Sequence, residues 1–502
     1  MQREKAYKAL LEAHRNIALL SSIEEVLAWD NRTYMPRDAS SYRADQIAFI
    51  TGMVHEKRTD PRIGDLLGEL GAVQVKKEDF SVESVNLREW QRDYDRLVKL
   101  PKDLVEEKSR TAVKAQDAWV EARKNNNFAL FKPWLEKTVE LSLKVANCLG
   151  YEKDPYDALL DEYEPGASTD DVAETLNQLR DALVPMIRAI ENAPNKPDVS
   201  ILKCRFPVHI QRDFATEVAK AIGYSFDRGR LDETAHPFCI SLGPHDTRIT
   251  THYNENFFSG AFFGVTHEAG HGIYDQNMPV EHWGTPMGDY VSLGIHESQS
   301  RMWENMVARS HAFWEYWYKK AQERFTSLAD VRLDDFHFAV NEVRPSLIRI
   351  EADEVTYNLH IMLRFELERV LLTGDLKAAD VPEAWNEMFK AYLGIDVPND
   401  SLGCLQDIHW AGGMIGYFPT YAFGNLNAAQ LFERASEDLG DLDAMFRAGD
   451  FTPLREWLTK NIHNQGKRYR SGKLIEVVTG QPLDASSLIR YLKSKFSSLY
   501  GI

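Results

Sequence analysis

Apolar and polar residues alternate with a helical period along most of the chain. From Ser168 onwards, apolar residues recur at steps of three and four, with a bend expected at Pro185. These residues are Val172, Leu176, Leu179, Leu183, Ile187 and Ile190. A second helix is predicted from Asp380, where the sequence resembles a capping box, to the residue before Gly394. The stretch 347–372 contains neither glycine nor proline, and we predict a long helix over it.

One short region departs from this pattern. Residues 239–242 and 248–253 are β-prone and the turn-forming sequence 243–246 separates them, so we predict a small hairpin there. No repeat of fixed period and no linker rich in glycine, serine or proline divides the sequence. We therefore predict one continuous, mostly α-helical domain over residues 1–502.

The chain has 502 residues, of which 44% are hydrophobic, and this is ample material for a large packed core. Residues 1–15 mix charged and apolar side chains, which favours an amphipathic helix over an export signal. Charges interrupt the apolar stretches, and none approaches the roughly 20 residues that cross a bilayer. We therefore expect a soluble protein that has no membrane partner.

Charge and cysteine content narrow the function classes further. The formal net charge of −17 repels phosphate backbones, which argues against nucleic acid as a partner. The cysteines lie far apart and form no CxxC pair, so neither a disulfide framework nor a thiolate zinc site is indicated. A reducing cytoplasm fits this composition best.

The clearest chemical signal is an HExxH motif at 267–271. Positions i and i+4 of a helix share a face, so His267 and His271 can both reach one ion while Glu268 remains free to activate the attacking water. Two imidazoles and a carboxylate suit zinc, with one position left open for water. The motif also occurs in proteins without a metal, as a helix with two packed histidines.

The third ligand has to come from elsewhere, because no xxGxxH extension follows His271. The acidic candidates downstream are Asp275, Glu281, Asp289, Glu297 and Glu304. We favour Glu297 because a helical pattern resumes around it, so a second helix can cross the first and present one carboxylate. The alternative is a surface glutamate that pairs with Arg301 at i+4.

With 267–271 and 296–299 (His-Glu-Ser-Gln), the chain resembles the carboxypeptidase Taq family of zinc carboxypeptidases. Other segments match that family's motifs, in the expected order: 236–238 its DHPF, 246–250 its DxRxT, 348–353 its IRxxAD and 403–410 its GxxQDxHW. Trp29-Asp30 and Met35-Pro36 also resemble segments of that family. Ala235 stands where the first motif has Asp, which leaves the metal site untouched and puts any supporting role of that Asp in doubt.

The resemblance implies a mostly α-helical, elongated fold with a deep central groove and a small β-sheet next to the zinc helix. It also implies a cytoplasmic homodimer that acts on peptides. Such an enzyme would release single C-terminal residues with broad specificity and disfavour C-terminal proline. One zinc ion per chain is expected, and cobalt or manganese could substitute for it.

A carboxypeptidase also needs a cation that reads the terminal carboxylate of its substrate. We predict Arg349 in this role, because a guanidinium binds carboxylate through two parallel hydrogen bonds. The alternative is a structural ion pair of Arg349 with one of its acidic neighbours Glu351, Asp353 and Glu354. His409 is predicted as a second substrate contact, or else as a core histidine beside Trp410.

Further roles are predicted around the attacked carbonyl. A tyrosine hydroxyl suits the oxyanion; Tyr421 is our candidate and Tyr417 its rival. Arg248 is predicted to border the groove on an edge strand that pairs with extended peptide. Asp246 and Asp407 are interpreted as groups that orient ligands or helix ends.

Two other functions remain open on the sequence. An endo-oligopeptidase or a dipeptidyl carboxypeptidase would share the zinc site and differ in the carboxylate clamp. A non-catalytic helical scaffold would use the same helices without hydrolysis, but the intact Glu268 argues against it.

Overall fold

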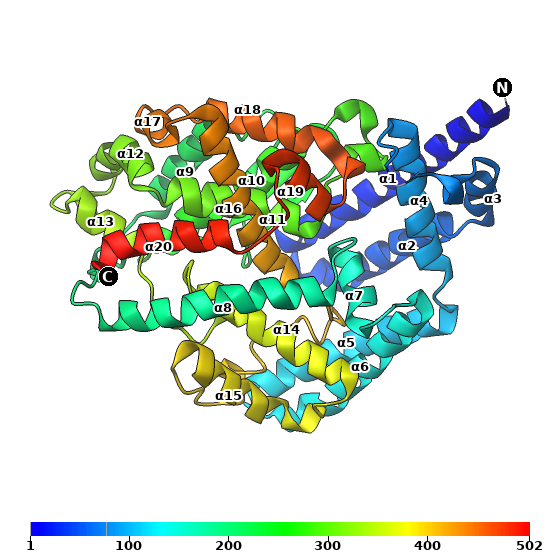
Figure 1. Cartoon of the computed structure of the whole chain (residues 1–502), viewed down its shortest axis with the longest axis horizontal. Coiled ribbons are helices and arrows are strands. Elements are labelled where there is room, and N and C mark those ends of the chain that lie inside the picture. The colour runs from blue at the N-terminus through cyan, green and yellow to red at the C-terminus, as the bar shows by residue number, and fades with distance from the viewer. Residues whose placement is uncertain (1, 77) are drawn as a thin grey trace.

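The computed structural model describes residues 2–76 and 78–502, and helices make up most of it (Figure 1). The first half contains α1 (Gln2–Arg32), α2 (Ser40–Arg58), α3 (Pro61–Glu69), α4 (Val82–Val98), α5 (Lys102–Lys124), α6 (Phe128–Leu149), α7 (Pro155–Tyr163), α8 (Thr169–Asn192) and α9 (Val208–Ile222). Three strands follow: β1 (Leu231–Glu233), β2 (Cys239–Ser241) and β3 (Thr247–Thr251).

The second half of the chain is again helical. It contains α10 (Phe258–Gln276), α11 (Leu293–Arg301), α12 (His311–Arg324), α13 (Leu333–Val340), α14 (Tyr357–Thr373), α15 (Val381–Leu393), α16 (Pro419–Leu439), α17 (Leu442–Arg447), α18 (Thr452–Asn461), α19 (Ser471–Thr479) and α20 (Ser486–Tyr500). The predicted fold class, mostly helical with a small sheet beside the HExxH helix, is confirmed. The prediction of one domain over 1–502 stays a prediction.

Two of the predicted helices are confirmed. α8 begins after Ser168, whose side chain accepts from the backbone N–H of Asp171, and it continues through Pro185. α15 ends at Gly394, where φ is 75° and a residue with a Cβ would be strained. The capping box is wrong, because the side chain of Asp380 makes no hydrogen bond to the helix start.

The long helix predicted over 347–372 is confirmed only from Tyr357 onwards, and its first part is wrong. Residues Arg349–Glu351 form a single 3₁₀ turn, and α14 begins only at Tyr357. Asp353 begins a new turn instead, because its carboxylate accepts from the backbone N–H groups of Val355 and Thr356 at 2.9 and 3.0 Å, as a residue at a helix start does. This break separates Arg349 from α14 and turns it toward the groove described below.

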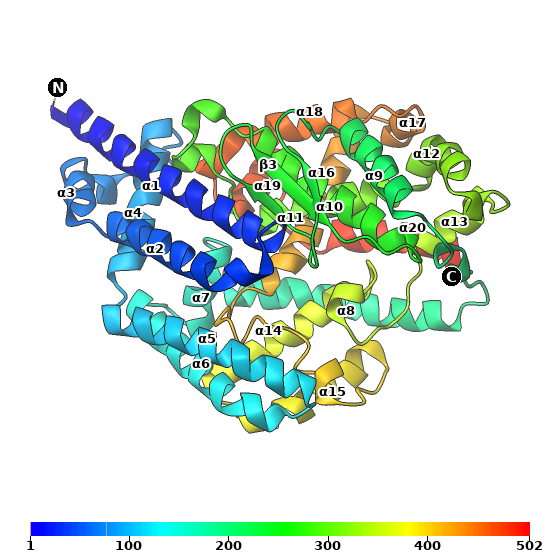
Figure 2. The ribbon, with the colours of Figure 1, turned by 180° about the vertical axis from the view of Figure 1, so that it is seen from behind.

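The sheet lies against α10 (Figure 2). The predicted hairpin is confirmed: β2 and β3 are antiparallel, with Ile240 opposite Arg248. The strand order is β1-β3-β2, because β1 pairs with β3 in parallel. The predicted edge position of the 248–253 strand is therefore wrong, since β3 is central and β1 and β2 are the edge strands.

Two groups of buried apolar side chains hold the helices together. The larger surrounds α10, α11, α14 and α16 and includes the fully buried Trp303, Trp314 and Trp317. The smaller joins α1, α3 and α4 through residues such as Leu10, Leu67 and Trp90. Along the described residues, no helix is both long and apolar enough to cross a membrane.

Candidate metal centre and active site

Helix α10 carries both histidines of the HExxH motif. Its N-terminal half is fixed by aromatic packing: Phe258 and Phe262 are buried, and their rings stack with centroids 5.2 Å apart. His267 and His271, one turn apart on the same helix, both line a large groove. Packing of the apolar face therefore fixes which side of α10 presents the imidazoles.

Two glycines let α11 come close to this helix. A Cβ at Gly270 would lie 2.6 Å from the carbonyl oxygen of Gln299, which is closer than real Cβ atoms come. A Cβ at Gly424, on α16, would lie 2.3 Å from Cγ of Glu297. Because both positions lack a side chain, α11 is held between α10 and α16, and Glu297 reaches the two histidines.

In the described part of the chain, His267, His271 and Glu297 form a group that could hold a metal ion. Oε2 of Glu297 lies 3.6 Å from Nε2 of His267 and 3.3 Å from Nε2 of His271. Two ligands of a tetrahedral ion with bonds of roughly 2.1 Å are about 3.4 Å apart. The spacing and the nitrogen and oxygen donors therefore fit one ion of that geometry.

A carboxylate outside this group orients His267. Nδ1 of the ring lies 2.9 Å from Oε2 of Glu304, which leaves Nε2 for the metal. Glu304 lies on a π-helical segment, Met302–Ala308, whose wider turn follows α11 directly. Burial raises the pKa of Glu304, but the hydrogen bond with His267 and the charges of Arg301 and Arg309 lower it to about 2.

The other carboxylates near the site are also accounted for. Oε1 of Glu297 pairs with Nε of Arg301 at 2.7 Å. The ion pair with Arg301, which was the alternative role for Glu297, therefore forms while the other carboxylate oxygen faces the histidines. Asp275 accepts from Nε2 of His296 at 2.9 Å, and the His296 ring stacks on that of His271. Asp275 and Glu304 therefore support the histidines rather than replace Glu297.

Glu268 lines the groove beside these ligands. Its side chain is only 7% exposed, and burial is the main reason that its pKa is raised to about 7. The nearby His267 lowers the pKa, whereas the negative charges of Glu297 and Glu304 raise it. A carboxylate with a pKa near neutrality can both accept and return a proton.

Arg349 lies on the 3₁₀ turn and is 5% exposed. Its Nη2 lies 2.8 Å from Oδ1 of Asp407, and its Nη1 donates to the hydroxyl of Tyr357 at 3.0 Å. Asp407 also pairs with Arg364, at 2.6 Å. Two guanidinium groups therefore share one carboxylate, and the cluster keeps one net positive charge.

A group of tyrosines covers this arginine. Tyr357, Tyr417 and Tyr421 line the groove, and the guanidinium carbon of Arg349 lies 5.0 Å from the ring centre of Tyr421. His409 lies 3.4 Å from the Tyr421 hydroxyl through Nε2 and is not among the lining residues. Burial lowers the pKa of His409 to about 4, so its ring is neutral.

The groove has a volume of about 1770 Å³ and joins these parts into one site. It runs from residues of α1, such as His14, past Ile240 on the free edge of β2 to the HExxH histidines, and on to Arg349. The deep groove expected from the sequence is therefore present, with the candidate metal ligands and the candidate carboxylate reader on its walls.

Comparison with known proteins agrees with this geometry. The profile of the carboxypeptidase Taq (M32) metallopeptidases matches residues 9–496. The chain belongs to this family. Thermostable carboxypeptidase 1 of Thermus thermophilus is 46% identical over all of both chains, and carboxypeptidase 1 of Bacillus subtilis is 39% identical over 98% of each. The crystal structure of an M32 carboxypeptidase from Deinococcus radiodurans R1 aligns with a TM-score of 0.95 and 38% identity, covering 99% of this chain and 100% of that one.

Arg248, which was predicted to border the groove of this M32 chain, is not among the residues that line it. Arg248 pairs with Asp246 at 2.8 Å and stacks over Trp29, 4.2 Å from its ring centre. Arg248 thus ties the end of α1 to the central strand, and Asp246 orients that arginine. Ala235 is exposed in the connection between β1 and β2 and is not among the lining residues either.

Other residues of this M32 site were missed from the sequence. Tyr357 and Arg364 contact Arg349 and Asp407, and neither belongs to a motif that points to chemistry. Glu368 is fully buried and accepts from the Tyr156 hydroxyl, the Trp410 indole and the Gly416 N–H at 2.7, 2.8 and 3.0 Å. It holds the loop that leads to Tyr417, and nothing in the sequence distinguishes it from the neighbouring charged residues Glu366 and Arg369.

Proposed function

We propose that this member of the carboxypeptidase Taq family is a zinc-dependent carboxypeptidase that releases single amino acids from the C-termini of peptides. The observation that carries the proposal is the position of Arg349 in the same groove as His267, His271 and Glu297. A peptidase that cuts internal bonds does not need a buried cation beyond the scissile bond, whereas a carboxypeptidase does.

We assign the metal to His267, His271 and Glu297. Bound there, zinc supplies a Lewis acid that polarises the carbonyl and lowers the pKa of water. Glu268 takes the proton from the attacking water and returns it to the leaving amine, for which a pKa near neutrality is suitable. We propose the Tyr421 hydroxyl as the donor to the oxyanion, with Tyr417 as its neighbour and rival.

Arg349 reads the terminal carboxylate of the substrate in this proposal. The net positive charge shared with Arg364 and Asp407 is the electrostatic reason, since a bound carboxylate balances it. We propose that His409 acts through Tyr421, whose hydroxyl it contacts, rather than on the substrate itself. Arg248 acts indirectly by fixing α1 beside the groove.

The free edge of β2 supports binding of an extended peptide backbone. Residues 237–243 line the groove, and β2 pairs with β3 on one side only. Recognition through the backbone and the terminal carboxylate supports broad specificity, and a proline at the scissile bond offers no N–H. We therefore propose a preference against C-terminal proline. From the family resemblance we also propose that the protein is a cytoplasmic homodimer.

The test compares one peptide with a free and an amidated C-terminus by mass spectrometry. We expect a ladder of single-residue losses from the free acid and no release from the amide. Arg349→Lys keeps the positive charge but cannot form two parallel hydrogen bonds with a carboxylate, so its kcat/KM should fall by about 10- to 100-fold. Equal cleavage of both peptides, or release of dipeptides, would favour the endo-oligopeptidase or dipeptidyl carboxypeptidase instead.

A further inference from the structure

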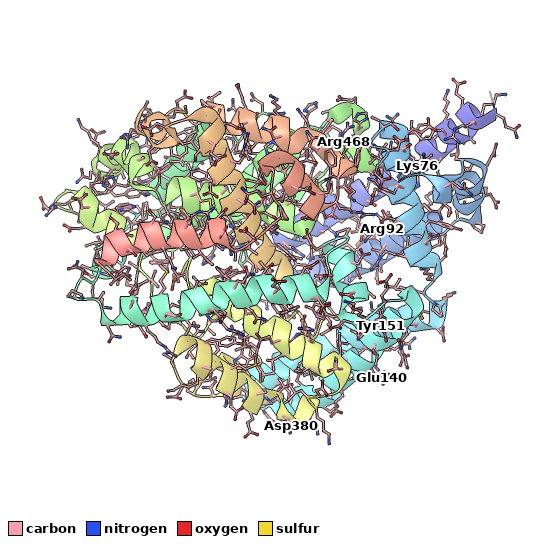
Figure 3. All side chains as sticks on the ribbon, viewed as in Figure 1. Lys76, Arg92, Glu140, Tyr151, Asp380 and Arg468 are labelled. Carbon is pink, nitrogen blue, oxygen red and sulfur yellow. The ribbon has the colours of Figure 1, made fainter. Side chains whose placement is uncertain are left out.

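A second cavity, separate from the groove, lies at the C-terminal end of α10. Its volume is about 540 Å³, and its walls come from the turn after α9, the end of α10 and the 3₁₀ segments Val280–His282 and His463–Arg468. Arg468, labelled in Figure 3, and Arg228 line it together. The proposed peptidase function does not use this cavity.

Each of the two arginines is held in place by a carbonyl oxygen. Nη1 of Arg228 donates to the carbonyl of Gln276, and Nη1 of Arg468 donates to the carbonyl of Phe80, both at 2.6 Å. Carbonyl oxygens fix the direction of a guanidinium and offset only part of its charge, as the negative end of the α10 dipole does for Arg228. Across residues 2–76 and 78–502, neither arginine has a carboxylate within ion-pairing distance.

This arrangement is unusual for the molecule. Most other half-buried arginines of the described residues are matched by acids, as Arg92 and Arg96 are by Asp161 at 2.8 and 2.9 Å. The chain as a whole carries a net charge of −17, so carboxylates are in excess. Two half-buried guanidinium groups that face one cavity without such partners therefore leave a local positive charge.

The walls of the cavity are rigid enough to keep the two charges in place. The buried Gln276 side chain accepts from the N–H of Ser225 at 2.9 Å and donates to the carbonyl of Arg228 at 3.2 Å. On the other wall, the carbonyl of Arg468 accepts from Arg88 at 3.1 Å. The guanidinium groups thus need little reorganisation to receive a ligand.

We propose that this cavity binds a small phosphate-bearing anion between Arg228 and Arg468. Guanidinium groups match tetrahedral oxyanions through paired, charge-assisted hydrogen bonds. His282 and Asn464 also line the cavity and add further donors. Its volume exceeds that of a phosphate ion, so a phosphomonoester of a small organic molecule fits the same place.

Two features oppose the anion: the negative end of the α10 dipole at Gln276 and one acidic side chain. Glu281 lies on the exposed rim of the cavity and is not paired with either arginine. Its carboxylate weakens anion binding by like-charge repulsion, which salt screens. This makes Glu281 a site where a substitution should increase affinity without disturbing the hydrogen bonds that hold the arginines.

The test is calorimetric titration of the full-length protein with inorganic phosphate and, in a second arm, with glycerol 3-phosphate, at constant ionic strength. We expect one saturable site for at least one probe. Arg228→Gln and Arg468→Gln should each weaken it about 10- to 100-fold, and Glu281→Gln should tighten it several-fold. Arg332→Gln, in an exposed pair with Asp334, is the matched control and should change nothing.

Phosphate that binds in the peptidase groove would be insensitive to Arg228 and Arg468, so that result overturns the proposal. Absence of saturable binding by both probes overturns it as well. Because Arg228 caps the end of α10, circular dichroism and the melting temperature must show that its variant is folded. If it is not, Arg468→Gln and Glu281→Gln decide the question, since neither removes the bond to Gln276.

Discussion

His267 and Glu304 lie 2.9 Å apart, joined through Nδ1 of the imidazole. The carboxylate holds the ring so that Nε2 points to Glu297 and His271, and it makes the imidazole a better ligand. Glu304 occupies this position because the π-helical segment Met302–Ala308 follows α11 without a break. We therefore expect a residue outside the ligand group to contribute to metal affinity.

Replacing Glu304 should therefore weaken metal binding. We expect Glu304→Ala to lower zinc affinity about 10- to 100-fold, and Glu304→Gln to lower it less because an amide oxygen still accepts the hydrogen bond. Competition with a chromophoric chelator measures the affinity. The melting temperature of the metal-free protein serves as the control for folding, and unchanged affinity in both variants would refute the role of Glu304.

A methyl group at Gly270 should displace α11 and so disturb the metal site. The added Cβ would lie 2.6 Å from the carbonyl oxygen of Gln299, so α11 has to move and take Glu297 with it. We expect Gly270→Ala to destabilise the fold by about 1–3 kcal/mol and to weaken zinc binding. Gly68→Ala is the control, since its Cβ would meet nothing within 4 Å. Equal behaviour of the two variants in urea unfolding would contradict this prediction.

Burial raises the pKa of Glu368 from 4.5 to about 7. Between these values the folded protein holds a proton that the unfolded chain releases, so the contribution of Glu368 to stability is present below pH 4.5 and is lost as the pH rises to 7. The slope is about 1.4 kcal/mol per pH unit. Glu368→Gln, which is always neutral, should remove this decline. Parallel stability curves for both proteins between pH 5 and 7 would show that Glu368 does not titrate there.

Local patterns in the sequence predict the metal group well. The spacing of His267 and His271 depends on one helical turn, and Glu297 lies in the next helix along the chain. The break before α14 was missed because the stretch contains no glycine or proline, although an aspartate such as Asp353 is a residue type that often begins a helix.

Contacts between distant segments could not be predicted in this way. Asp407 lies 58 residues from Arg349, and neither residue carries a periodic or motif signal for the pairing. The central position of β3 likewise depends on the parallel strand β1, which has no turn that connects it directly to β3. Such features depend on how whole helices and strands pack, which the order of residues does not reveal locally.

The central claim is that His267, His271 and Glu297 hold a catalytic zinc ion beside the base Glu268. The most direct measurement determines, in the variant Glu268→Gln, both the zinc content by elemental analysis and the release of C-terminal residues by mass spectrometry. The account predicts one zinc ion per chain and a rate at least about 100-fold below that of the wild-type protein. Full release of C-terminal residues by this variant, or a wild-type protein that binds no stoichiometric metal, would contradict it.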